Sequence, residues 1–83
     1  MKTTEIIEKY VAHVDLKYKS TKTRQIYKTR MYQFTKEHSQ LHRISSLELK
    51  RYLFSIKEAD LSDSYFNQML AALHIIYDVI LNQ

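Results

Sequence analysis

The chain contains neither glycine nor proline among its 83 residues, and this absence limits the folds open to it. Glycine supplies the positive φ angles that tight hairpins, phosphate-binding loops and nucleophile elbows require. Without it, connections must rely on Ser, Thr, Asn and Asp, which also cap helices. The sequence therefore predicts an all-α domain, and it argues against enzymes built on glycine-rich loops or sharp catalytic turns.

Apolar residues recur every three to four positions in four segments of the chain. This spacing places them on one side of a helix, so each segment is expected to form a helix with one buried face. A chain of this length makes one domain, and we expect residues 1–83 to form a compact bundle of four helices. The predicted helices cover about residues 4–17, 21–38, 46–58 and 63–82.

Hydroxyl side chains mark the start of each predicted helix, where they can accept hydrogen bonds from free backbone amides. Glu48 follows Ser45 at capping-box spacing, and Leu61 with Phe66 is expected to form a hydrophobic staple around the start of the fourth helix. The expected caps are Thr3 or Thr4, Ser20 or Thr21, Ser45, and Ser62.

The fourth predicted helix carries the broadest apolar stripe. Its expected core residues are Phe66, Met69, Leu70, Leu73, Ile76, Tyr77 and Ile80. From Ile75 onward the helix is apolar almost all round. We therefore expect Ile75, Val79 and Leu81 to pack against something outside this chain.

Positive charge is concentrated between Lys17 and Lys36. This segment holds seven of the thirteen Lys and Arg residues and none of the nine Asp and Glu residues, whereas the rest of the chain has six basic and nine acidic residues. The formal net charge of +4 is thus a local property of one segment. A positive field of this kind favours a polyanionic partner.

The basic segment also has a periodic outer side. Opposite the apolar stripe, the second predicted helix presents basic, hydroxyl, amide and aromatic groups, namely Lys22, Gln25, Thr29, Tyr32 and Lys36, with Thr21 and Lys28 beside them. Lys, Ser and Thr side chains contact phosphates, and amides can read adenine edges. The pattern favours a nucleic-acid surface, and the alternative is an ordinary solvated, lysine-rich face.

The start of the fourth helix has an outer face of a different kind. It is small, uncharged and rich in amides, with Ser64, Asn67, Gln68 and Ala71. Lys and Glu dominate most solvent-facing helices, so this face suits a close approach to a DNA groove. The alternative is that these amides are simply solvated and contact no nucleic acid.

Three ordered blocks of residues span the second, third and fourth predicted helices. They are Ser20-x-x-Thr23-x-x-x-Tyr27 with Met31 and Phe34, then Ile44-Ser-x-x-Glu-Leu-x-x-Tyr-Leu53-x-x-Ile56, then Leu61-Ser62 with Asn67, Leu70 and Leu73-x-x-Ile76-Tyr77. The pattern of these blocks resembles the SAM-like core-binding domain of tyrosine recombinases, also called phage integrases.

The resemblance implies that the second and fourth helices lie against double-stranded DNA while a separate catalytic domain of the same full-length protein clamps the opposite side. Other recombinase protomers on the DNA would be further partners. It implies DNA contacts on the second helix from Ser20, Thr21, Lys22, Thr23, Arg24 and Lys28, to which the helix pattern adds Gln25 and Thr29. On the fourth helix it implies contacts from Ser62, Ser64, Asn67 and Gln68.

We expect no catalytic residue, cofactor or metal site in this chain. The family's Arg, His and Tyr catalytic set belongs to the downstream domain, and no such sequence is present. Four of the tyrosines, Tyr10, Tyr27, Tyr52 and Tyr77, fall on core stripes. The chain lacks cysteine, and its histidines are scattered. With no apolar run of about 20 residues, we expect no membrane partner. The resemblance implies a cytoplasmic protein encoded by a bacterium or a phage.

Two other functions stay open at this point. Leu47 and Phe54 lie off the predicted core stripe of the third helix, so they and the end of the fourth helix would serve a helical protein–protein adaptor. An RNA-binding bundle would use the same basic side of the second helix.

Overall fold

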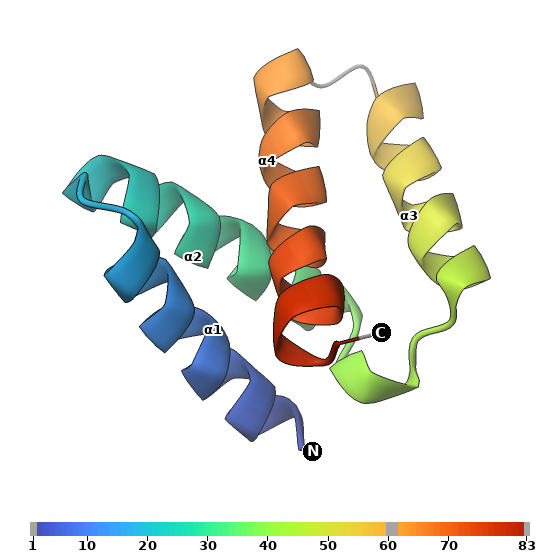
Figure 1. Ribbon diagram of the computed structural model, residues 1–83. Helices are drawn as coiled ribbons and strands as arrows, with labels where there is room; N and C mark the ends of the chain where they lie inside the picture. The colour runs from blue at the N-terminus through green and yellow to red at the C-terminus, as the bar shows by residue number, and fades with distance from the viewer. Residues whose placement is uncertain (1, 60–61, 83) are drawn as a thin grey trace.

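The structure is a computed structural model that describes residues 2–59 and 62–82. Over these ranges it consists of helices joined by short connections, without a strand, which confirms the predicted all-α class (Figure 1). The elements in chain order are α1 (Thr3–Lys17), α2 (Thr21–Glu37), the 3₁₀ turn η1 (Leu41–Arg43), α3 (Ser46–Glu58), α4 (Asp63–His74) and the π-helical segment η2 (Ile75–Ile80).

Helix α4 is the central element of the bundle. It crosses α2 on one side and packs beside α3 on the other, while its continuation η2 lies against α1 (Figure 1). Helix α1 also packs along α2 and touches η1. As a result, α2 has a neighbour on two flanks and solvent on its remaining side.

The buried side chains form one cluster at the meeting point of these helices. The largest of its fully buried side chains are Tyr10 and Phe34. Phe34 meets the rings of Tyr52 and Tyr77 edge to face, with ring centroids 5.0 and 6.5 Å away. Such arrangements match the positive edge of one ring to the negative face of another. The full cluster is Ile6, Tyr10, Val14, Met31, Phe34, Leu41, Ile56, Met69, Ala72, Leu73, Ile75, Ile76 and Tyr77.

Three of the four predicted caps are confirmed. The hydroxyl oxygens of Ser20, Ser45 and Ser62 each accept a hydrogen bond from the backbone amide three residues ahead, at 3.1 to 3.3 Å. The cap predicted for the first helix is wrong. Helix α1 begins after Lys2, whose side chain makes no capping bond.

Thr3 has a different role from the one predicted. Its hydroxyl donates to the carbonyl of Ser39 at 3.0 Å and accepts from the amide of Leu41 at 3.2 Å. The hydroxyl is therefore used to fasten the start of α1 to a distant connection, and it is not available to its own helix.

The connection after α2 is more ordered than a plain loop. It contains η1, in which Leu41 is completely buried, and the phenol of Tyr77 donates to the Leu41 carbonyl at 2.8 Å. The sequence pattern did not predict this burial, because a lone leucine between two polar residues has no periodicity to reveal it.

The C-terminal part of the fourth helix differs from its prediction. The α-helical part ends at His74, and the backbone then widens into η2, where the Leu81 amide donates to the Ile76 carbonyl. Ile75 is only 2% exposed, because η2 packs against α1 and the core, so the expected outside partner is wrong for this residue. Leu81 packs against the same core, whereas Val79 remains exposed.

Leu70 was predicted to lie in the core but is 45% exposed. It faces the space between α3 and α4, which the two helices leave partly open. The staple predicted for Leu61 and Phe66 lies outside the described residues, because Leu61 is not among them.

Candidate nucleic-acid interface

The outer side of α2 is exposed along its whole length. Met31 and Phe34 turn inward and are fully buried, so the positions half a turn away face solvent. Those positions are occupied by the predicted ridge residues, and each of them is exposed. We refer to this set as the α2 ridge, consisting of Lys22, Gln25, Thr29, Tyr32 and Lys36.

The first turn of α2 holds its polar side chains close to the helix. Nη2 of Arg24 donates to the Thr21 hydroxyl at 3.2 Å and to the Lys19 carbonyl at 3.4 Å, which folds the guanidinium back along the turn. The Ser20 oxygen accepts from the Thr23 amide, so its own hydroxyl proton remains free to donate. Thr23 itself is half-buried, consistent with its place on the apolar stripe.

Two ridge-side groups have partners that limit what they can offer a ligand. The Thr29 hydroxyl donates to the Gln25 carbonyl at 2.8 Å, so it presents lone pairs to solvent. The Lys28 ammonium lies 2.7 Å from the Asp15 carboxylate on α1, and the side chains are 28% and 43% exposed. The basic segment has no acid of its own, yet a neighbouring helix supplies one.

Arg30 is fixed where α2 crosses α4. Its Nε donates to Gln68 Oε1 at 3.0 Å, its Nη1 donates to Gln33 Oε1 at 2.9 Å, and its guanidinium lies 4.2 Å from the centroid of the Tyr65 ring. The Tyr65 hydroxyl also donates to Gln33 Oε1, at 3.1 Å. We call these four residues the Arg30 cluster: Arg30, Gln33, Tyr65 and Gln68.

The predicted residues at the start of α4 divide between two flanks. Ser64 and Asn67 are exposed, and the Ser62 hydroxyl caps the helix. Gln68 is half-buried and turned toward α2 by its bond to Arg30. Asn67 instead borders the space between α4 and α3. The structure thus joins Gln68 to the α2 side of the molecule and places Asn67 next to a separate groove.

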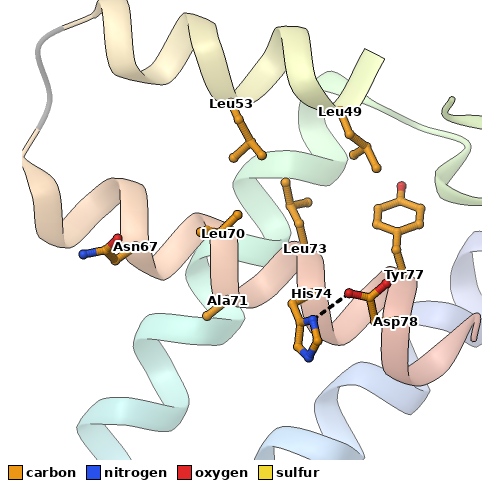
Figure 2. Close-up of a pocket in the computed structure, with 9 residues that line it drawn as sticks. All are labelled: Leu49, Leu53, Asn67, Leu70, Ala71, Leu73, His74, Tyr77 and Asp78. Atoms are coloured by element: carbon orange, nitrogen blue, oxygen red, sulfur yellow. Dashed lines mark hydrogen bonds and ion pairs between the residues drawn. The ribbon is translucent and has the colours of Figure 1, made fainter. Parts of the chain in front are cut away.

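That groove runs between α3 and α4 and has a volume of about 520 Å³ (Figure 2). Leucine side chains from both helices point into it, while Asn67 lies near one end and the His74–Asp78 pair, 2.6 Å apart, near the other. Its walls are Leu49, Leu53, Leu70, Ala71, Leu73 and Tyr77. A groove of this composition can take an apolar side chain and offers little chemistry.

Four tyrosines on the core side of the helices are buried or partly buried, and their phenols resist deprotonation. Burial raises the pKa of the Tyr10, Tyr52 and Tyr77 phenols far above the ordinary value near 10, and it also raises the pKa of Tyr27. These groups therefore stay neutral at physiological pH, and the Tyr10 hydroxyl is already donating to the Tyr27 carbonyl at 2.8 Å.

The histidines do not gather around a common point. His38 stacks on Phe34, with ring centroids 4.5 Å apart, and its Nδ1 lies 3.3 Å from the Phe34 carbonyl. Residues 2–59 and 62–82 contain no group of three His, Cys, Asp or Glu side chains placed to hold a metal ion. No helix within those ranges is long and apolar enough to cross a membrane.

Comparison with protein-family models, with curated proteins and with solved structures finds no match to this chain. The functional interpretation therefore depends on the surfaces themselves. Sequence reasoning found the α2 ridge, because its residues follow helical spacing. It missed Arg30, Gln33 and Tyr65 as site residues, although the three-residue spacing of Arg30 and Gln33 was a local signal for their contact.

Proposed function

We propose that this domain binds double-stranded DNA through the α2 ridge and the first turns of α4. In this proposal it is the DNA-binding module of a site-specific tyrosine recombinase, or integrase, whose separate C-terminal domain cleaves and rejoins the strands. The recombinase assignment draws on the three ordered sequence blocks, and the DNA assignment draws on the surface.

The observation that carries the DNA assignment is the exposure of the α2 ridge in a segment without acidic residues. Lys22 and Lys36 are fourteen positions apart on one helix, a rise of about 21 Å. This distance is enough to cross a major groove about 12 Å wide and reach phosphates of both strands. Between them, the Gln25 amide can donate to a backbone phosphate or a base edge, and the Thr29 oxygen can accept from a base amino group.

The test is a titration of labelled duplex DNA at several salt concentrations. We expect a Kd of roughly 10⁻⁴ to 10⁻⁶ M and, if about four phosphates are contacted, a slope of log K against log salt of about −3 to −4. The double variant Lys22→Glu with Lys36→Glu should lose most of this binding. The matched control is Lys50→Glu with Lys57→Glu on α3, which makes the same charge change away from the ridge.

Equal losses in the two double variants would show that only net charge matters, and they would contradict the ridge assignment. Competition with an RNA hairpin separates the two nucleic acids. Displacement of the duplex by the hairpin at lower concentration than by unlabelled duplex would favour RNA as the ligand.

A protein–protein adaptor is the second candidate, and exposed apolar side chains on α3 and α4 favour it. Phe54 is 63% and Leu47 57% exposed on α3, while Leu70 of α4 faces the separate α3–α4 groove. Large exposed apolar side chains are typical of interaction surfaces when they gather in one patch. The adaptor function predicts a partner or self-association that Phe54→Glu abolishes and that charge reversal of the ridge leaves unchanged, as measured by sedimentation velocity.

A further inference from the structure

The Arg30 side chain is held on three sides, unlike an ordinary surface arginine. Gln68 of α4 accepts from its Nε, Gln33 of α2 accepts from its Nη1, and its Cζ lies over the Tyr65 ring, 4.2 Å from the ring centroid. Ordering a free arginine on binding would oppose association, because this side chain loses up to about 2 kcal/mol of rotamer entropy. In this domain the fold has already ordered it.

The cluster presents hydrogen-bond donors to its surroundings. An arginine can only donate, so both glutamines must turn their amide oxygens toward it. The Gln33 oxygen also accepts from the Tyr65 hydroxyl. What remains is the NH₂ group of each glutamine, one N–H of Arg30 Nη1 and both N–H groups of its Nη2, for which no described residue serves as acceptor. Because Arg30 is half-buried, part of its guanidinium still reaches solvent.

The position of the cluster connects the two parts of the proposed interface. Arg30 and Gln33 each follow a ridge residue, Thr29 and Tyr32, by one position, which places them about 100° farther around α2. That flank faces α4, which contributes Tyr65 and Gln68. The Arg30 cluster therefore lies between the α2 ridge and the start of α4.

We propose that the Arg30 cluster binds one backbone phosphate of the nucleic acid. This inference rests on the proposed function and names a contact within it. A phosphate offers only acceptors, and a guanidinium donates to its oxygens in a planar fork. Adenine is a poor match, because a glutamine reading adenine must accept as well as donate, and the Gln68 oxygen is occupied by Arg30. Gln68 then acts by positioning Arg30 and does not read a base.

The test compares Arg30→Gln with Arg51→Gln, an exposed arginine on α3, in duplex titrations by fluorescence anisotropy. We expect Arg30→Gln to weaken binding about tenfold at 0.1 M salt, as loss of a charge-assisted hydrogen bond does. Its log–log salt slope should be shallower by about 0.9, the value for one phosphate. Arg51→Gln should change neither quantity.

A duplex of A·T pairs only and one rich in G·C pairs distinguish a phosphate from a guanine as the bound group. A phosphate contact predicts the same loss on both duplexes. A loss confined to the guanine-containing duplex would overturn the inference, because arginine would then be reading guanine O6 and N7.

Arg30→Gln removes a contact between α2 and α4, so this variant changes the packing of the fold as well as the surface. A second measurement therefore uses the unaltered protein. In a ¹H–¹⁵N spectrum the Arg30 Nε–H resonance should shift on addition of duplex, while that of Arg51 should stay in place. An unmoved Arg30 resonance at saturating duplex would overturn the inference and leave the ridge assignment, tested by Lys22 and Lys36, standing. If the unaltered protein bound no duplex, the phosphate inference and the ridge assignment would both be refuted.

Discussion

If the domain binds DNA as proposed, replacement of Asp15 by Asn should strengthen that binding while slightly weakening the fold. The Asp15 carboxylate lies 2.7 Å from the Lys28 ammonium and competes with any phosphate that approaches this lysine. The neutral amide would release Lys28 toward solvent and the neighbouring ridge. One substitution outside the basic segment therefore tests whether Lys28 belongs to the interface.

The magnitude follows from the exposure of the pair and from counterion release. Both side chains are partly exposed, at 28% and 43%, so losing their attraction should reduce the free energy of unfolding by no more than about 1 kcal/mol. One additional phosphate contact should make the log–log salt slope more negative by about 0.9. Between 0.2 and 0.05 M salt, the advantage of Asp15→Asn over the original protein should then grow roughly 3.5-fold.

The assay is the duplex titration, run in parallel with Glu8→Gln as the matched control. Glu8 is an exposed acid on the same helix, and its neutralisation changes the net charge by the same amount. We expect a steeper slope for Asp15→Asn than for Glu8→Gln. Identical slopes in the two variants would refute the reasoning, because the gain would then come from overall charge and Lys28 would make no contact of its own.

Three further predictions concern the fold. Leu41→Ala should lower the free energy of unfolding by about 2–4 kcal/mol in urea denaturation. Leu16→Ala, at a position 89% exposed, should change it by less than about 0.5 kcal/mol. Similar effects of the two substitutions would show that Leu41 is not enclosed. Burial raises the pKa of Tyr10 and Tyr77 above the unfolded value near 10, so the unfolded chain loses these protons first as the pH rises. The free energy of unfolding should therefore fall above pH 10. A urea concentration at the unfolding midpoint that stays constant from pH 9 to 11.5 would contradict this. Ser62→Ala removes the α4 cap and should lower stability by about 1 kcal/mol, and an unchanged melting temperature would show that the cap contributes nothing.

Local sequence signals predicted most of the fold. Helical spacing located the buried faces that hold Tyr10 and Phe34, and hydroxyl residues located the starts at Ser45 and Ser62. Such features depend on neighbours within a turn or two, so one segment carries all the information needed to recognise them.

The errors and omissions involve partners that are distant in the chain. Thr3 bonds to residues 36 and 38 positions away, and Arg30 bonds to Gln68 at a separation of 38. Lys28 finds its acid on another helix. No pattern in one segment encodes these pairs, because they exist only after the helices have taken their places. The part of the candidate site that lies on one helix was therefore predictable, and the crossing of α2 and α4 was not.

The connection at residues 39–41, which follows α2, limits where the polypeptide can be cut without loss of folding. Thr3, near the N-terminus, donates to the Ser39 carbonyl, and Tyr77, near the C-terminus, donates to the Leu41 carbonyl, each across 36 residues. Residues near both ends of the chain therefore bind the same connection in its middle. Closing two long loops is entropically unfavourable until both extremities have docked, which favours a single all-or-none folding transition. A split version or a circular permutant opened at this connection should fail to assemble, even though the α1–α2 and α3–α4 pairs would each be intact in sequence.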